Sequence, residues 1–204
     1  VHQAIEPDGS TFELETGPGT RAWVALHAMS PHIADAVVAH EDAAFFRHRG
    51  FAPWAIKDAL ARNLREGRYV VGASTITMQL AKNLFLRREK TLVRKLQEVV
   101  FTWWLERSFD KEGILTLYLN VIEYGPSVYG IDAASRWWFD KSPALLDPVE
   151  AAILAMILPA PKSYAHMRAA GELSPNMRSR VARFLRHMAE TRRLDPESLQ
   201  YALA

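Results

Sequence analysis

Helix-start signals restrict the fold of this chain more than any other feature of its sequence. In several places a Ser or Asp that can cap a helix stands directly before a proline, which suits the first helical position and disrupts later ones. These pairs are Ser30-Pro31, Asp147-Pro148, Ser174-Pro175 and Asp195-Pro196. They predict a mainly α fold, in which only residues 11–15 and 22–26 have the composition of short strands.

Apolar spacing extends this prediction along the chain. Helices are expected from Pro31 through Phe45, over 53–67, after a cap at Ser74 or Thr75, over 89–107, after a cap at Asp110, and over 128–139. The sequence "DPVE" has the residues of a capping box and opens "AAILAMIL", which is apolar on nearly all sides and predicts a central buried helix. No repeat or linker interrupts the chain, so residues 1–204 are expected to form a single domain.

The composition excludes several classes of function. The 204 residues are 49% hydrophobic, enough to bury a core, and contain no cysteine, which excludes disulfides, thiolate metal sites and cysteine catalysis. A formal net charge of +2 gives no case for nucleic acid. No apolar run approaches the roughly 18 residues that a membrane span needs. The chain starts with Val1 rather than Met, so we expect a processed piece that lacks an upstream anchor.

Two local features each allow two interpretations. Basic side chains concentrate in residues 87–95 and 178–193, either as solvated helix faces or as surfaces for phosphates or anionic lipid. The aromatic pairs Trp103-Trp104 and Trp137-Trp138 fit either core packing or a membrane interface, where indole rings are favoured.

The stretch "HEDAAFFRH" contains a candidate general base. On a continuous helix Glu41, Phe45 and His48 would share one face, since they are spaced i, i+4 and i+7. A carboxylate beside an aromatic ring is partly desolvated, which raises its pKa and favours its use as a base, and His48 would orient it. The alternative is a surface acid pair with a histidine at a helix end.

Two further stretches suit the binding of an anion. "GASTITMQLAKN" places hydroxyl, amide and ammonium groups behind a glycine turn, either as a grip for an anion or as a helix cap with a solvated outer face. "RKLQE" sets Arg94 and Lys95 at helical spacing from Glu98, either as an ordinary ion pair or as a second carboxylate held among cations.

Taken in order, these stretches and two more resemble glycosyltransferase family 51, the peptidoglycan glycosyltransferases. "EDAAFFRHRGF", "GASTITMQLAKNLF", "RKLQE", "KEGILTLYLNVIEYG" and "WWFDKSPALLDPVEAAILAMILPAP" are similar to the five blocks of that family. The resemblance covers residues 23–164, and the shared order and spacing make a chance match very improbable.

The resemblance implies roles for the residues of these blocks. Glu41 would be the general base that takes the proton from the 4-hydroxyl of the acceptor lipid II. Glu98 would be a second carboxylate that assists departure, orients the cations or helps to hold a divalent ion. The other family positions would bind the donor diphosphate and sugar or support Glu41, and they are Asp42, His48, Ser74, Thr75, Gln79, Lys82, Asn83, Lys90, Arg94 and Lys95. The glycine turn and the helix N-terminus behind it would add backbone N–H donors.

The family also implies the reaction and its setting. Glycan linked to undecaprenyl diphosphate would be transferred to lipid II with inversion, giving β-1,4-linked strands without an organic cofactor, with Mg or Mn as the divalent cation. The partners would be these lipid-linked substrates, the membrane surface and other cell-wall synthases, at the outer face of the bacterial cytoplasmic membrane. Nucleic acid is not expected.

The implied fold is a lysozyme-like, two-lobed helical domain with a cleft between a larger lobe and a smaller mobile lobe. The smaller lobe is expected around residues 50–72, a hydrophobic platform that dips into the bilayer around 51–71, and C-terminal helices over 174–204.

Some positions depart from the family pattern. Ala73 and Met78 replace a glycine and a glutamine, and Met78 would remove an amide from the donor side. Asp140 replaces a glycine beside Lys141, where an extra acid would weaken a phosphate contact. None of these departures touches Glu41 or Glu98, so an active enzyme is expected. Two other functions stay open beside it: a catalytically silent module that binds lipid-linked precursor or serves as a scaffold, and a lysozyme-like enzyme that cleaves glycan.

Overall fold

The computed structural model describes residues 2–5, 11–67, 74–86 and 92–204 of a mainly helical chain, as the helix signals predict. The chain divides into two compact units. The first unit comprises Val1–Glu41 and Leu119–Ala204, and the second comprises Asp42–Tyr118. The second unit is longer than the segment 50–72 in which we expected the smaller lobe. Lys90, Gly72 and Ala73 lie outside the described residues.

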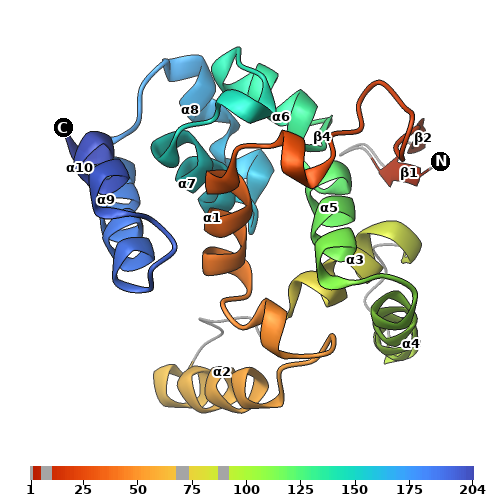
Figure 1. The fold of residues 1–204 in the computed structure, drawn as a ribbon. Helices are drawn as coiled ribbons and strands as arrows, with labels where there is room; N and C mark the ends of the chain where they lie inside the picture. Colours follow the sequence, from red (N-terminus) through yellow and green to blue (C-terminus); the bar gives the residue numbers. More distant parts are fainter. Residues whose placement is uncertain (1, 6–10, 68–73, 87–91) are drawn as a thin grey trace. The chain divides into compact units, whose positions relative to one another are not determined.

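The first unit is built around one buried helix. In α7 (Pro148–Ile157) every side chain from Ala151 to Ile157 is buried, so the prediction of a central helix is confirmed. Three helices pack against α7 or against its neighbour: α1 (Pro31–Glu41), α9 (Pro175–Glu190) and α10 (Pro196–Leu203) (Figure 1). The expected capping box is present, because Asp147 accepts from the Glu150 backbone N–H and Glu150 from the Asp147 N–H.

The other elements of this unit are short. They are the antiparallel strands β1 (His2–Ile5) and β2 (Thr11–Leu14), the hairpin β3 (Glu123–Gly125) and β4 (Val128–Tyr129), the 3₁₀ turns η1 (Leu26–Ala28), η3 (Pro143–Leu145) and η4 (Pro161–Tyr164), and the helices α6 (Ile131–Phe139) and α8 (Ala165–Ala170). The strand predicted at 11–15 is confirmed. The helix predicted over 128–139 was placed too early, because Val128–Tyr129 pairs with β3 and the helix begins at Ile131.

The strand predicted at 22–26 is wrong, and a side chain explains why. The Val24 backbone N–H donates to Asn120 Oδ1 at 2.9 Å, and Asn120 Nδ2 donates to the Val24 carbonyl at 2.8 Å. One amide side chain therefore satisfies both backbone groups of Val24, as a neighbouring strand would otherwise do.

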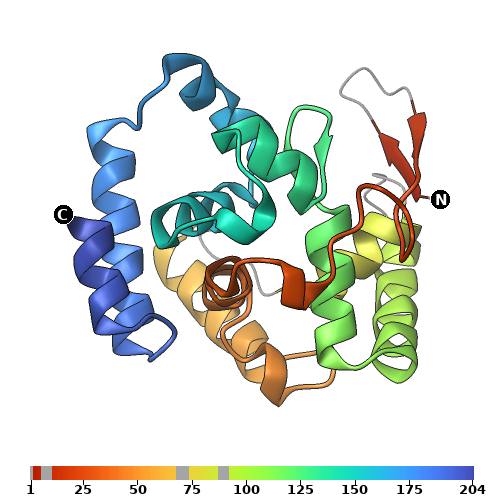
Figure 2. The same ribbon diagram turned by 45° about the horizontal axis from the view of Figure 1, so that its top comes forward.

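The second unit consists of η2 (Phe45–Arg47), α2 (Pro53–Glu66), α3 (Ile76–Phe85), α4 (Leu92–Ser108) and α5 (Lys111–Val121) as far as Tyr118. Figure 2 shows α3 beside α4, against which it packs. The prediction that one helix runs from Pro31 through Phe45 is wrong, because α1 ends at Glu41 and Phe45 lies in a separate 3₁₀ turn. Phe45 is nevertheless completely buried, so its apolar character reports packing rather than helical continuity.

Helix α4 has two unlike faces. Its buried face carries Glu98, Thr102 and Leu105, whereas Leu96, Val100 and Trp103 are 68%, 62% and 55% exposed. Core packing of the Trp103-Trp104 pair, one of the two interpretations above, is therefore contradicted. The second pair, Trp137-Trp138, lies in the first unit. There Trp138 Nε1 donates a hydrogen bond to the Tyr124 backbone carbonyl at 2.9 Å, so this indole contacts the protein itself.

Asp140 ends α6 in the left-handed conformation, with φ 55°. This explains a glycine at the equivalent family position, since glycine adopts that conformation without steric cost and Asp tolerates it better than most residues do. The ion-pair partner of the neighbouring Lys141 is Glu150 and not Asp140, because Lys141 Nζ lies 2.7 Å from Glu150 Oε1. This hydrogen bond raises the pKa of Lys141.

We expect Asp140→Gly to raise the free energy of unfolding by about 0.5–1 kcal/mol, because the left-handed backbone then carries no Cβ. Asp140→Ala should lower it by about 1 kcal/mol, since Ala lacks the short polar group that tolerates this conformation. Urea denaturation followed by circular dichroism measures both changes. Equal midpoints for the three proteins would contradict this account of position 140.

Candidate active site

Glu41 is the last residue of α1 in the first unit, and its side chain is 10% exposed. His40 Nδ1 lies 2.9 Å from Glu41 Oε1, so an Nδ1–H would donate to the carboxylate. The His40 ring is itself fixed edge-on against Phe184, with ring centroids 5.4 Å apart. The expectation that His48 orients Glu41 is therefore wrong, because the histidine that contacts Glu41 is His40.

His48 instead holds Asp42, the residue directly after Glu41. His48 Nε2 lies 2.9 Å from both carboxylate oxygens of Asp42, and Asp42 Oδ2 also accepts from the Ile76 backbone N–H at 3.1 Å. Both side chains are buried. This carboxylate therefore fixes the start of α3 and the segment around His48, rather than standing open to solvent.

Thr75 completes the start of α3. Its Oγ1 accepts from the Met78 N–H at 3.2 Å and donates to the Gly50 carbonyl at 2.6 Å, so the predicted cap is confirmed at Thr75. Gly50 is needed here, because its φ is +83° and an added Cβ would lie 2.7 Å from Thr102 Cγ2.

The N–H groups of Ile76 and Met78 thus already donate to Asp42 and Thr75. This argues against the expectation that the N-terminus of this helix binds the diphosphate, because a carboxylate already lies at that helix end. The glycine turn of the same expectation lies outside the described residues.

The polar face predicted for α3 is present. Lys82 and Asn83 are exposed, Gln79 is partly exposed on the same face, and Ser74 is exposed just before the helix. Gln79 Oε1 accepts from the hydroxyl of the buried Tyr118 at 3.0 Å, which fixes the direction of the amide.

The departure at position 78 falls on a buried side chain of α3. Met78 is one turn before Lys82, but its side chain is only 6% exposed and is buried in the protein. The amide that the family pattern would place there is therefore missing from a buried position and not from the exposed face.

A second group of site residues lies on α4. Glu98 is 3% exposed, and both of its oxygens contact cations: Lys95 Nζ at 2.5 Å from Oε1 and Arg94 Nη1 at 3.2 Å from Oε2. The carboxylate therefore holds an ammonium and a guanidinium in fixed positions on one helix. The group carries one net positive charge, which suits a phosphate-bearing ligand.

This donor set does not fit a divalent cation. Within the described ranges there is no group of three or more His, Asp or Glu residues that could hold a metal ion. Glu98, the candidate ligand, already has a cation on each oxygen, so a divalent ion there would lie beside an ammonium and a guanidinium.

The structure also identifies supports that the sequence did not indicate. Glu106 Oε1 accepts from Thr77 Oγ1 at 2.5 Å and from Lys111 Nζ at 2.7 Å, which joins α3, α4 and α5. The sequence holds no local signal for this, since Thr77 and Glu106 are far apart in the chain. For His40 the signal was available, because it directly precedes Glu41.

The predicted site residues therefore form distinct groups. Asp42, His48 and Thr75 meet in a buried support at the start of α3, whereas Arg94, Lys95 and Glu98 meet on α4. Gln79, Lys82 and Asn83 share one face of the intervening α3, and Glu41 belongs to the other unit.

Several known proteins are similar in sequence to this chain. The sequence profile of the family described as transglycosylase matches residues 9–189. The biosynthetic peptidoglycan transglycosylase of Cupriavidus metallidurans is 42% identical over 197 residues, which cover 91% of this chain and 84% of that protein. Proteins with the same description are 47% identical in Thiobacillus denitrificans, over 72% of this chain and 63% of the relative, and 44% identical in Nitrosospira multiformis, over 79% and 70%.

Thr75→Ala should lower the free energy of unfolding by about 1–3 kcal/mol, because it removes the helix cap and leaves the buried Gly50 carbonyl without its donor. Ser74→Ala, at the exposed neighbouring position, is the matched control and should change stability by less than about 0.5 kcal/mol. Chemical denaturation measures both. A Thr75→Ala protein as stable as the control would show that Thr75 does not support the fold.

Proposed function

This chain belongs to the transglycosylase family, and we propose that it polymerises lipid II into the β-1,4-linked glycan strands of peptidoglycan by inverting glycosyl transfer. The growing glycan on undecaprenyl diphosphate is the donor, and lipid II is the acceptor. The observation that carries the proposal is the buried Glu98 with Arg94 and Lys95 on its two oxygens. A diphosphate leaving group needs fixed positive charge where its oxygens become more negative.

Glu41 is the proposed general base. It accepts the proton of the acceptor 4-hydroxyl while that oxygen forms a bond to the anomeric carbon of the donor and the bond from that carbon to the diphosphate breaks. Its side chain is 10% exposed, so its carboxylate is partly shielded from water, and His40 Nδ1 restrains one of its oxygens at 2.9 Å. Attack from the side opposite the leaving group inverts the configuration, as in inverting glycosidases with a sugar hydroxyl in place of water.

The cations act on the leaving group. Arg94 offers a planar pair of N–H donors to phosphate oxygens, and Lys95 and Lys82 add ammonium charge. A diphosphate leaves readily, so the reaction needs no strong general acid. Glu98 acts by positioning, because its contacts with Arg94 and Lys95 hold the two cations in place before the donor arrives.

The remaining predicted residues have two kinds of role. Ser74, Gln79 and Asn83 are solvent-accessible and are proposed to contact the donor sugar and diphosphate. Asp42, His48 and Thr75 support the start of α3 from inside the fold. A divalent cation such as Mg or Mn carries no step here, because the donor set around Glu98 does not suit it.

We place the reaction in a lysozyme-like, two-lobed fold, in a cleft between a larger and a smaller lobe, at the outer face of the bacterial cytoplasmic membrane. The substrates carry polyprenyl chains, so the enzyme must meet the bilayer. Among the described residues, no helix is both long and apolar enough to span a membrane.

The exposed face of α4 is the proposed contact with the bilayer. Val93, Leu96, Val100 and Trp103 are spaced i, i+3, i+7 and i+10 and are each more than half exposed. An apolar helix face with an indole ring suits the interfacial region of a bilayer. The platform expected at 51–71 has exposed apolar side chains on α2 as well, at Trp54, Ile56 and Leu64.

Glu41→Gln should reduce polymerisation of labelled lipid II by about 10²–10⁴-fold, because the amide cannot accept the hydroxyl proton. The matched control is Glu190→Gln at an exposed position of α9, which should keep full activity. The same assay with preformed glycan strands separates the alternatives. Shortened strands would indicate a glycan-cleaving enzyme, and binding of lipid II without turnover would indicate a silent module.

Leu96→Ser should weaken partition into phosphatidylcholine vesicles about tenfold, since a leucine side chain that enters the bilayer contributes on the order of 1.5 kcal/mol or more. Leu145→Ser is the control, because Leu145 in η3 is 67% exposed against 68% for Leu96. Vesicle co-sedimentation measures the difference. Equal effects of the two substitutions would place the membrane contact elsewhere.

A further inference from the structure

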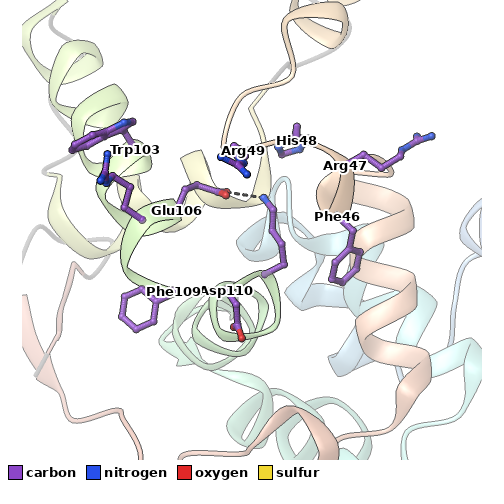
Figure 3. Close-up of a pocket in the computed structure, with 10 residues that line it drawn as sticks. Phe46, Arg47, His48, Arg49, Trp103, Glu106, Phe109 and Asp110 are labelled. Atoms are coloured by element: carbon purple, nitrogen blue, oxygen red, sulfur yellow. Dashed lines mark hydrogen bonds and ion pairs between the residues drawn. The ribbon is translucent and has the colours of Figure 1, made fainter.

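A pocket of about 790 Å³ lies at the C-terminal end of α4 in the second unit. Residues 46–49, 103, 106, 107 and 109–111 line it (Figure 3). In Figure 3, Trp103 and Phe46 lie on opposite sides of this pocket, with Arg49 and Glu106 between them. Among its lining residues only His48 belongs to the site residues predicted above, and its proposed role is to support the start of α3.

The pocket carries an excess of positive charge. Four cationic side chains line it against two carboxylates, and both carboxylates have partners within the protein. Glu106 accepts from Thr77 and Lys111, and Asp110 Oδ1 accepts from the Gly113 backbone N–H at 2.7 Å, which confirms its predicted cap.

Three arginines line the pocket, and in Figure 3 the side chain of one of them, Arg47, points away from it, which leaves Arg49 and Arg107 to interact with a ligand. In the part of the chain that the structure describes, no carboxylate forms an ion pair with Arg49 or Arg107, and both side chains are exposed. The Arg107 guanidinium lies over the Trp103 ring, 4.8 Å from its centroid. This stacking restrains the guanidinium plane and leaves its N–H edge available for an anion.

We propose that this pocket binds the phosphate of an anionic phospholipid headgroup through Arg49 and Arg107. The inference rests on the proposed contact of α4 with the bilayer. Planar guanidinium groups bind phosphate oxygens in a bidentate manner, and a phosphodiester keeps its negative charge at neutral pH.

Continuity with the apolar face of α4 favours a lipid over a soluble anion. Trp103 belongs both to that face and to the pocket wall, and Phe109, 41% exposed, lies beyond it with its ring centroid 6.4 Å from that of Trp104. A headgroup in the pocket would therefore place its acyl chains beside Val100 and Trp103, at the level where indole rings meet the interface.

The test compares partition of the whole protein into phosphatidylcholine vesicles and into equimolar phosphatidylcholine and phosphatidylglycerol. Wild-type protein should prefer the anionic vesicles, and Arg49→Gln/Arg107→Gln should lose roughly tenfold or more of that preference, since each basic side chain near an anionic surface contributes on the order of fivefold. Arg49→Lys/Arg107→Lys keeps the charge but loses the bidentate geometry, so it should retain part of the preference.

Arg183→Gln/Arg186→Gln removes the same charge from exposed positions on α9 and is the matched control, expected to change the preference at most about twofold. Equal losses in the two glutamine pairs would overturn the pocket assignment in favour of general electrostatic attraction. Soluble glycerol phosphate provides another arm: if it binds at the arginines while vesicles show no anionic preference, the lipid assignment is wrong.

Bilayer contact and catalysis are measured separately. Absence of binding to either vesicle type would overturn the membrane contact and this assignment together, whereas intact binding to neutral vesicles without anionic preference would overturn the pocket alone. The Arg49→Gln/Arg107→Gln protein should still polymerise lipid II in detergent solution, and circular dichroism should show an unchanged fold. Loss of polymerisation there would place the arginines in the catalytic machinery instead.

Discussion

The buried carboxylate of Asp42 holds together the part of the second unit on which the proposed chemistry depends. It pairs with His48 Nε2 and with the Ile76 N–H, so a single side chain fixes a returning loop and the start of α3. Leaving these partners unsatisfied would cost on the order of several kcal/mol, which explains why the chain turns at Asp42 instead of continuing α1. Of two adjacent acids, one therefore serves the fold, and the other, Glu41, is the proposed general base.

Helix α4 carries both the cations of the proposed active site and the apolar face proposed to contact the bilayer. Glu98 and Val100 are two residues apart and so point in directions about 200° apart around the helix. One face holds a buried carboxylate with its cations, and the other leaves apolar side chains exposed. If the exposed face meets the bilayer, the cations proposed to bind the diphosphate belong to the element that contacts the membrane, which shortens the path of a lipid-linked substrate to them.

Local rules in the sequence predicted the helix starts well, because a cap and a proline act on their own neighbours. Thr75, Asp110 and Asp147 are caps as expected, and α7, which is apolar on nearly all sides from Ala151 onward, is central. Predictions failed where a partner distant in sequence decides the outcome. Asn120 replaces a strand beside Val24, and Asp42 interrupts the helix before Phe45. The exposure of Trp103 likewise depends on what packs on α4, which periodicity cannot show, since a stripe that meets lipid has the same spacing as one that meets core.

The departures from the family pattern follow the same division between fold and chemistry. Met78 replaces glutamine at a buried position, where a thioether packs without needing a hydrogen-bond partner, and Asp140 replaces glycine at a left-handed helix end that Asp tolerates. Lys82, Asn83, Arg94 and Lys95 keep the family residues on accessible or partly accessible faces. A buried position accepts any residue that packs well, and a position at a left-handed turn accepts any residue that tolerates that backbone conformation. A cation that binds phosphate, in contrast, has no apolar substitute. The two described departures are therefore changes in how the scaffold is built, and the charges proposed to act on the donor remain in place.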